Sequence, residues 1–457
     1  MTSIEYQLAR TTWASRILGY LHPQVSQSSL DSSDDETLES EDDDLADALE
    51  AGTTKVEILV NPTQSAKEKF IDCLAELMSP EHGWGGVIAT SLRVTQNAIY
   101  VDVAANSGFE KGLHTWDGLE RAITECLMAQ ASCDEKTREI GCYNFEEVAV
   151  EFSHKRLTKH AERILSVATI EIQNNVVLSE ILEIIRQPRS SDDPQSRIRL
   201  ARLAYEFTRS GNIGIIPDTL TKKQKSHLWR NLRFLGRPIH NCRLIAQIGL
   251  NFPQFRKIEI HHIPRPQPTK LQPEYIISFK DALRRLGLEE CEQKLLSNSK
   301  YPVPTWSSFN SKSKEGLYAH AEVQLLAWHS ANPHMKPFLD YFGCSKRTCL
   351  LCEALMRTHS PIILSRGRHG VCFPDWGIPH PLFVNSPSIL ITLEHYFVER
   401  IRHYVVGKGY NIYQNVAQSS FVSTLHSQEL LAPRVREILI ETHETEKSAY
   451  IENERAL

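Results

Sequence analysis

Long apolar runs are missing from this 457-residue sequence. A membrane-spanning helix needs about 20 consecutive apolar residues, and no stretch approaches that length, so we expect no membrane segment. The first 22 residues also lack the apolar core and the small-residue cleavage site of a secretory signal peptide. Together these absences favour an intracellular protein, located in the cytoplasm or the nucleus.

Cysteine is too sparse for a disulfide framework, with ten residues spread over the whole chain. Small secreted domains that depend on disulfides have a much higher cysteine density. Only Cys344, Cys349 and Cys352 lie close together in the sequence. We therefore expect reduced thiols and one metal cluster that involves this group.

Charge is unevenly distributed along the chain. Residues 31–50 contain eleven acidic side chains and no basic one. Such a segment has too few apolar side chains to offset the entropy lost on ordering. We predict a disordered acidic linker over 23–60, after a short amphipathic helix within 1–22. We interpret the linker as a solvated spacer, with mimicry of nucleic acid as the alternative.

Residues 61–253 mostly carry apolar side chains three or four positions apart, which predicts a mainly helical domain. A partly alternating stretch at 87–104 interrupts this pattern and indicates strands. The C-terminal half is basic, since 186–270 holds seventeen Lys or Arg against five acidic residues. With Trp229 and Phe234 among the cations, the region either binds single-stranded nucleic acid or has solvated cations over core aromatics.

From residue 254 the pattern changes to short strands that alternate with helices. This alternation predicts an α/β domain in which helices cover a sheet. We place the domain at 254–405, including a strand at 388–393 and a helix at 394–405, and assign 406–457 to a C-terminal extension. Nothing in the sequence indicates the oligomeric state.

The most specific feature of the chain lies within that α/β domain. His320-Ala321-Glu322 opens one predicted helix, and Cys349-x-x-Cys352 opens another, which we expect Thr348 to cap. Two thiols three positions apart at a helix start can hold one metal, and the helix N-terminus favours their ionised form. Residues two apart on a helix point about 200° apart. His320 and Glu322 can therefore converge only off the end of their helix.

Zinc fits this set of side chains. His320, Cys349 and Cys352 would leave a fourth position open for water, as in catalytic zinc sites. Zinc lowers the pKa of its bound water toward about 7, so that hydroxide is available as a nucleophile. Glu322 is then free to carry the water's proton to a ring nitrogen of a nucleobase and on to the leaving amine.

The segment His320–Leu326, with Gly343-Cys344-Ser345-Lys346 and the Cys349/Cys352 pair, resembles a largely fungal family of deaminase-like proteins. That family belongs to the cytidine-deaminase-like superfamily of nucleotide and nucleic-acid deaminases. The resemblance implies a three-layer α/β/α domain with a mixed five-stranded sheet and one Zn²⁺. It also implies hydrolytic deamination of a cytosine or adenine base in a nucleoside, a nucleotide or nucleic acid. The wider superfamily has Pro where this chain has Thr348, which weakens the transfer of substrate contacts.

Cys344 leaves a second interpretation open, because it precedes Cys349 by only five residues. A Cys3His zinc site that includes it is coordinatively full and normally structural. The chain would then be an inactive deaminase-like module that binds RNA or protein. We favour three ligands, with Cys344 as a small buried residue at a strand end.

Substrate contacts are predicted only from their position near the motif, and each has packing or surface exposure as its alternative. The candidates are Phe309, Asn310, Trp328, Lys346 and Arg347, with Trp306 and Trp376 as further aromatic side chains that could stack a base.

Overall fold

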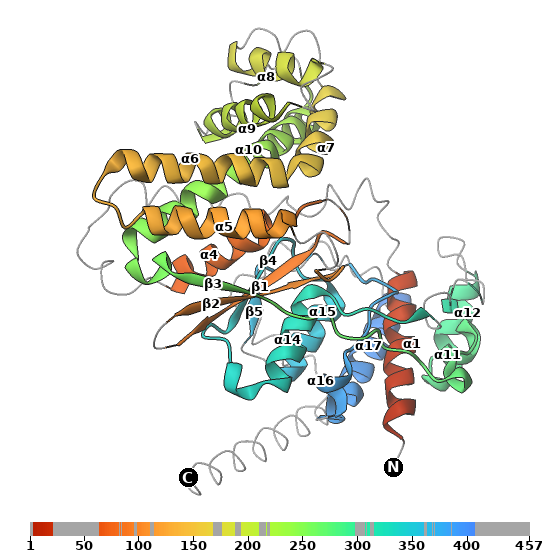
Figure 1. Ribbon diagram of the computed structural model, residues 1–457. Coiled ribbons are helices and arrows are strands. Elements are labelled where there is room, and N and C mark those ends of the chain that lie inside the picture. Colours follow the sequence, from red (N-terminus) through yellow and green to blue (C-terminus); the bar gives the residue numbers. More distant parts are fainter. Residues whose placement is uncertain are drawn as a thin grey trace, which may run out of the picture.

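The computed structural model has an α/β architecture, with one five-stranded sheet and helices on both of its faces (Figure 1). The predicted class and the mixed five-stranded sheet are thereby confirmed. The structure describes residues 3–21, 64–81, 83, 85–95, 98–109, 114–167, 176–187, 193–209, 216, 220–297, 307, 309–310, 315–360, 363–367, 369, 371–384 and 386–406. The predicted linker at 23–60, nearly all of the extension at 406–457 and Trp306 lie outside these residues.

The sheet combines a hairpin with three further strands. The strands are β1 Ile88–Val94, β2 Ile99–Ala105, β3 Ile258–His262, β4 Tyr341–Cys344 and β5 Leu364–Ser365. Their order in space is β3-β2-β1-β4-β5. Strand β1 runs antiparallel to its neighbours β2 and β4, whereas β2 with β3 and β4 with β5 form parallel pairs. Strands β1 and β2 are the strands indicated at 87–104.

Helices make up most of the remaining described chain. They are α1 Ile4–Leu21, α4 Gln64–Leu77, α5 His114–Ala129, α6 Glu135–Phe152, α7 His154–Leu165, α8 Val176–Arg186, α9 Pro194–Arg209, α10 Lys222–Asn251, α11 Phe279–Arg285, α12 Glu289–Ser297, α14 Ala321–Ala331, α15 Leu350–His359, α16 His380–Val384 and α17 Ser388–Val406. Within the described residues, none of them has the length and apolar character that crossing a membrane requires.

Successive side chains of β1 point to opposite faces of the sheet. Ile88 and Leu92 join an apolar core with residues of α4, α5 and α10. Ala89 joins the opposite core, which contains residues of α14, α15 and α17. On that second face, the hydroxyl of Ser91 lies 2.8 Å from Nε2 of His329 in α14. The sheet is therefore the middle of three layers, with α4 and α14 on opposite sides (Figure 1).

The predicted domain boundary at 253/254 has to be corrected, because it divides this sheet. Helices α5 to α10 lie in the chain between β2 and β3, which are neighbours in space. Strands β1 and β2, with α4 packed on β1 and β4, therefore belong to the α/β domain. Local periodicity identifies a strand, but it does not show which distant strand will pair with it.

The helical region between β2 and β3 is organised around the long helix α10. Thr221 caps the start of α10. The Thr221 hydroxyl accepts from the backbone N–H of Gln224, and the Gln224 side-chain oxygen accepts from the backbone N–H of Thr221. Helix α10 crosses α9 at Gly236, where an added Cβ would lie 2.7 Å from the backbone of Tyr205. Glycine at this position allows the two helices to approach closely.

The two ends of the described chain pack together as α1 against α17. Arg10 forms an ion pair with Glu394 at 2.7 Å, and the Thr11 hydroxyl donates to the Leu390 carbonyl at 2.9 Å. The N-terminal helix lies where it was predicted, but it is buried on most of its surface, polar side chains included, and has no broad solvent-exposed face. The strand predicted at 388–393 is wrong, because these residues begin α17; a short apolar run does not distinguish a buried strand from a buried helix face.

Candidate metal centre

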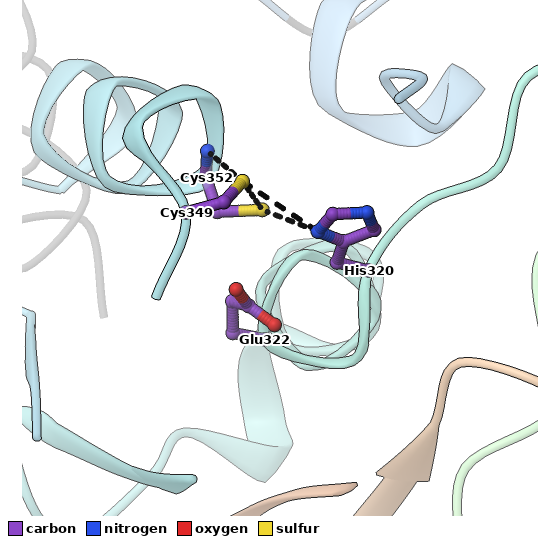
Figure 2. A group of neighbouring side chains, drawn as sticks. All are labelled: His320, Glu322, Cys349 and Cys352. Atoms are coloured by element: carbon purple, nitrogen blue, oxygen red, sulfur yellow. Dashed lines mark hydrogen bonds between the residues drawn. The ribbon is translucent and has the colours of Figure 1, made fainter. Parts of the chain in front are cut away.

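Two helix N-termini meet on the α14 side of the sheet. His320 is the N-cap residue of α14 and Cys349 is the N-cap residue of α15, both with extended backbone. Side chains at the start of each helix therefore face the other helix end-on. Figure 2 shows His320 and Glu322 opposite Cys349 and Cys352, with the carboxyl group beside the two sulfurs.

The donor atoms of these four residues all lie within 4.8 Å of one another. Nδ1 of His320 is 3.5 Å from Sγ of Cys349 and 3.3 Å from Sγ of Cys352, and the two sulfurs are 3.1 Å apart. Zinc bonds of about 2.0–2.3 Å in a tetrahedron separate the donor atoms by about 3.5–3.8 Å. The three donors therefore need to move only by tenths of an ångström to hold one zinc ion.

Electrostatics at the centre favour a thiolate at Cys349. Burial opposes its ionisation, yet its pKa lies well below the usual value, because hydrogen bonds with the side chain and the backbone N–H of Cys352 and the charge of His320 stabilise the thiolate. The same thiolate raises the pKa of His320 against the effect of burial. Burial also raises the pKa of the Glu322 carboxyl group. Glu322 therefore holds a proton more readily than an exposed glutamate does.

The start of α14 is tied to the end of β2. Oδ1 of Asn106, directly after β2, accepts from the backbone N–H of Ala321 at 2.6 Å. Nε2 of Gln324 donates to the carbonyl of Ala105 at 3.0 Å. Sequence analysis missed Asn106, whose only signal is an amide side chain that directly follows an alternating strand. Its bond fixes the helix that carries both His320 and Glu322.

The loop after β5 forms the other wall of the centre. Nε1 of Trp376 donates to Sγ of Cys352 at 3.2 Å, so the structure gives this predicted base-stacking residue a contact with a ligand sulfur. The ring of Phe373 lies 5.3 Å from that of His320 and 5.9 Å from that of His369. Burial, with the charge of His320, lowers the pKa of His369 to about 3. His369 is therefore a neutral imidazole near the centre, a role that its sequence position did not reveal.

Cys344 lies at the end of β4 and is not part of the group of four. Its thiol donates to the carbonyl of Phe342 at 3.6 Å, and its backbone N–H donates to Asp72 at 3.0 Å. Burial raises its pKa well above the usual value. This environment suits a neutral buried thiol better than a metal-bound thiolate.

Thr348 does not cap α15, contrary to expectation. Cys349 is the N-cap residue, and its sulfur accepts from the backbone N–H of Cys352 at 3.3 Å. The hydroxyl of Thr348 instead lies 2.6 Å from that of Ser365 in β5. The Cys349 sulfur thus both caps the start of α15 and faces the metal position.

None of the five predicted substrate contacts belongs to the group of four. Phe309 is buried, with its ring 5.9 Å from that of Tyr20 in α1. Asn310 is also buried and donates to the carbonyl of Ile277 at 2.8 Å. Both side chains lie in the core beside α1, and their role toward a substrate stays a prediction.

The other three predicted contacts have different surroundings. Trp328 lies in the C-terminal half of α14, with its ring 5.5 Å from that of His261 in β3. Nζ of Lys346 is 3.4 Å from the carbonyl of Gly83, and Arg347 is buried next to it. Lys346 and Arg347 lie in the segment that connects β4 to α15.

Several of the arginines at 186–270 are paired with carboxylates from other helices. Arg237 pairs with Glu76 at 2.8 Å, and Arg202 and Arg243 both pair with Glu146, at 2.8 and 2.9 Å. The two aromatic side chains also have partners, since Trp229 lies 6.1 Å from Phe207 and Phe234 stacks on His160 at 4.5 Å. The predicted nucleic-acid surface is accordingly left with fewer unmatched cations than the sequence count suggests.

Comparison with known proteins matches one segment of the chain. Residues 319–380 match a family model described as an OTT_1508-like deaminase, which is a deaminase family of the cytidine-deaminase-like superfamily. Comparisons with curated proteins and with solved structures gave no match. The matched segment contains the whole group of four. Residues 319–380 are thus similar to a deaminase domain, and this buried group could hold its metal.

Proposed function

We propose that this protein is a zinc-dependent hydrolytic deaminase that acts on a cytosine or adenine base. The observation that carries the proposal is the convergence of His320, Cys349 and Cys352 beside a carboxyl group, Glu322, that the metal does not need. The match of residues 319–380 to a deaminase family model supports the same reaction. The base can belong to a nucleoside, a nucleotide or nucleic acid.

The three donors suit zinc by their chemistry, since imidazole and thiolate are its preferred ligands. His320 would bind through Nδ1, the nitrogen that faces both sulfurs. Trp376 donates to Cys352 and would partly balance the charge of that sulfur. When bound, zinc supplies a Lewis acid that makes water a better nucleophile.

Glu322 is the proton carrier in this reaction. Hydrolytic deamination forms a C–O bond with water at the amino-bearing ring carbon, breaks the C–N bond and releases ammonia. The carboxylate accepts a proton from the water and delivers it to the adjacent ring nitrogen. It then assists proton transfer to the amine, which leaves as ammonia. Burial raises the pKa of Glu322, and this brings its proton affinity closer to that of the groups with which it exchanges.

Ammonia release by the zinc-loaded protein tests the proposal. We expect activity on at least one of a panel of cytosine and adenine nucleosides, nucleotides and single-stranded oligonucleotides. Glu322→Gln should lower kcat about 10²- to 10⁴-fold, the usual contribution of a general acid–base group, with zinc content unchanged. The matched control is Glu353→Gln in α15, where the side chain pairs with Arg357 and activity should stay within twofold. Full activity of Glu322→Gln would rule out the assigned proton carrier.

A further inference from the structure

Arg16, on α1, is a buried cation without a hydrogen bond. Its side chain is 1 % exposed, and none of its three guanidinium nitrogens has a partner within the described chain. Asp375 and Tyr20 lie near enough to favour its charge, but no well-aligned hydrogen bond to either one satisfies the guanidinium nitrogens. The guanidinium lies 5.5 Å from the ring centre of Phe309. On the same helix, Arg10 is fully engaged with Glu394.

A buried guanidinium group is unfavourable unless a bound group supplies hydrogen-bond acceptors for it. A buried cation that lacks hydrogen bonds loses its hydration, and the nearby Asp375, Tyr20 and Phe309 ring repay only part of that loss for Arg16. Burial accordingly lowers the pKa of Arg16. Because arginine stays protonated at all ordinary pH values, the guanidinium cannot escape the cost by losing its proton. An unsatisfied buried polar group in a native protein therefore points to a missing ligand.

The loop at residues 373–376 contacts both α1, which carries Arg16, and the metal centre. On one side of the loop, Pro374 packs so closely on α1 that a Cβ at Gly19 would lie 2.8 Å from its backbone nitrogen. On the other side, Phe373 contacts the His320 ring and Trp376 donates to a ligand sulfur. Helix α1 thus reaches the metal centre by way of this loop.

We propose that Arg16 binds the phosphate of a nucleotide substrate and makes the enzyme selective for phosphorylated over unphosphorylated nucleobase compounds. The planar guanidinium presents paired N–H donors that match phosphate oxygens. A phosphate is the anionic group that is covalently attached to a nucleobase substrate and can lie a short distance from its base. This inference rests on the proposed deaminase function, which supplies the base.

Burial of Arg16 is compatible with this role. Arg16 and the four residues of the metal centre are all at most 5 % exposed. A substrate therefore has to enter the closed interior in order to react at all. The burial of Arg16 is no greater obstacle to the phosphate than the burial of the metal centre is to the base.

Thermal unfolding of the zinc-loaded full chain tests Arg16 without any need for catalysis. Inorganic phosphate and cytidine or adenosine 5′-monophosphate should each raise the Tm of the wild-type protein. Arg16→Met should abolish the rise, and without phosphate it should be at least as stable as the wild type, because an unpaired buried charge is removed. The control Arg285→Met removes an exposed cation near Trp13 of α1 and should keep the rise.

The variant Asp375→Asn makes the thermal-unfolding test more decisive. If the position beside Arg16 takes a phosphate, Asp375→Asn removes a repelling charge and should tighten phosphate binding several-fold. If Asp375 is instead the structural counter-charge of Arg16, the same substitution lowers the Tm and leaves phosphate without effect. The second result, or a Tm of Arg16→Met below that of the wild type together with no phosphate effect on the wild type, overturns the inference.

Steady-state kinetics then addresses selectivity. Arg16→Met should lower kcat/KM for the nucleoside monophosphate about 10- to 100-fold, the usual range for a hydrogen-bonded charge, and change that for the nucleoside less than twofold. Arg16→Lys keeps the charge but not the paired donors, so its kcat/KM for the nucleoside monophosphate should lie between those of the wild type and Arg16→Met. Equal wild-type kcat/KM for the two substrates overturns the inference while the deaminase function stands. If no base is deaminated, the proposed function fails, and the phosphate effect on Tm still decides whether Arg16 is an anion site.

Discussion

The metal centre and the basic helical region differ in how their charged groups find partners. At the metal centre, four polar side chains from two helix starts converge on one point, and no other described His, Cys, Asp or Glu side chain joins their group. In the helical region, arginines that are close in sequence pair with glutamates from α4 and α6, such as Glu76 and Glu146. One set of side chains is arranged to receive a ligand, and several arginines of the other are neutralised within the protein.

The difference shows which sequence patterns can be interpreted locally. The side-chain directions of a His-x-Glu triplet and a Cys-x-x-Cys pair at helix starts are set locally, because a helix N-terminus fixes the direction of its first side chains. A run of basic residues does not fix the direction or the partners of its side chains in this way. Its effect depends on carboxylates elsewhere in the chain, and a count within a window does not include them.

The largest effect that tests this comparison is expected at Glu76, which is buried and pairs with Arg237 and Arg366. Glu76→Gln leaves two cations in low-dielectric surroundings without their counter-charge. We expect a loss of about 3 kcal/mol in the free energy of unfolding, measured by urea denaturation. Glu206→Gln is the control, because Glu206 is half exposed where it meets Arg243, and the loss there should stay below about 0.5 kcal/mol. Equal losses would show that the region is not internally neutralised.

A smaller effect is expected at Asp72, which is buried next to Cys344. Burial raises its pKa from 3.8 to about 6, although Arg366 and hydrogen bonds from Tyr341 and the Cys344 backbone oppose the shift. The folded protein therefore binds this proton more tightly than the unfolded chain, so stability falls as pH rises from about 4 to 6 and is then constant.

Asp72→Asn removes that dependence on pH. Above pH 6 the variant should be more stable than the wild type by at most about 3 kcal/mol, the equivalent of the shift in pKa. Urea denaturation at a series of pH values from 4 to 8 measures it. The control Asp117→Asn, on the exposed side of α5, should follow the wild-type curve. A variant that is less stable at every pH would show that the carboxylate is ionised and well paired.

The smallest effect concerns the exposed lysines at the start of α10. If the remaining cations of 186–270 contact single-stranded RNA, Lys222→Gln with Lys223→Gln should weaken binding less than tenfold. The slope of log affinity against log salt concentration should fall by about one for each lysine that contacts a phosphate. Lys136→Gln, at the exposed start of α6, is the control. A salt-independent affinity would remove the nucleic-acid proposal for this surface.

Sequence reasoning predicted the α/β class, strand structure at 87–104 and the two helices whose starts form the metal centre, because each depends on contacts between near neighbours. It placed the domain boundary inside the sheet, since the pairing of β2 with β3 bridges six intervening helices of the described chain. It also missed Asn106 and Arg16. Asn106 holds the start of α14, and Arg16 is the phosphate-binding residue that we propose. Both lie far from the motif in sequence, and neither belongs to a local motif.

The central claim is that the metal is held by three protein donors, two of them sulfur, with Glu322 beside an open position. X-ray absorption spectroscopy of the zinc-loaded protein tests this most directly, because it distinguishes sulfur from nitrogen and oxygen neighbours by bond length. The account predicts two sulfurs at about 2.3 Å and two lighter atoms at about 2.0 Å, with the same spectrum for Cys344→Ser. Three sulfurs in the wild type, reduced to two in Cys344→Ser, would contradict it and identify a closed structural site.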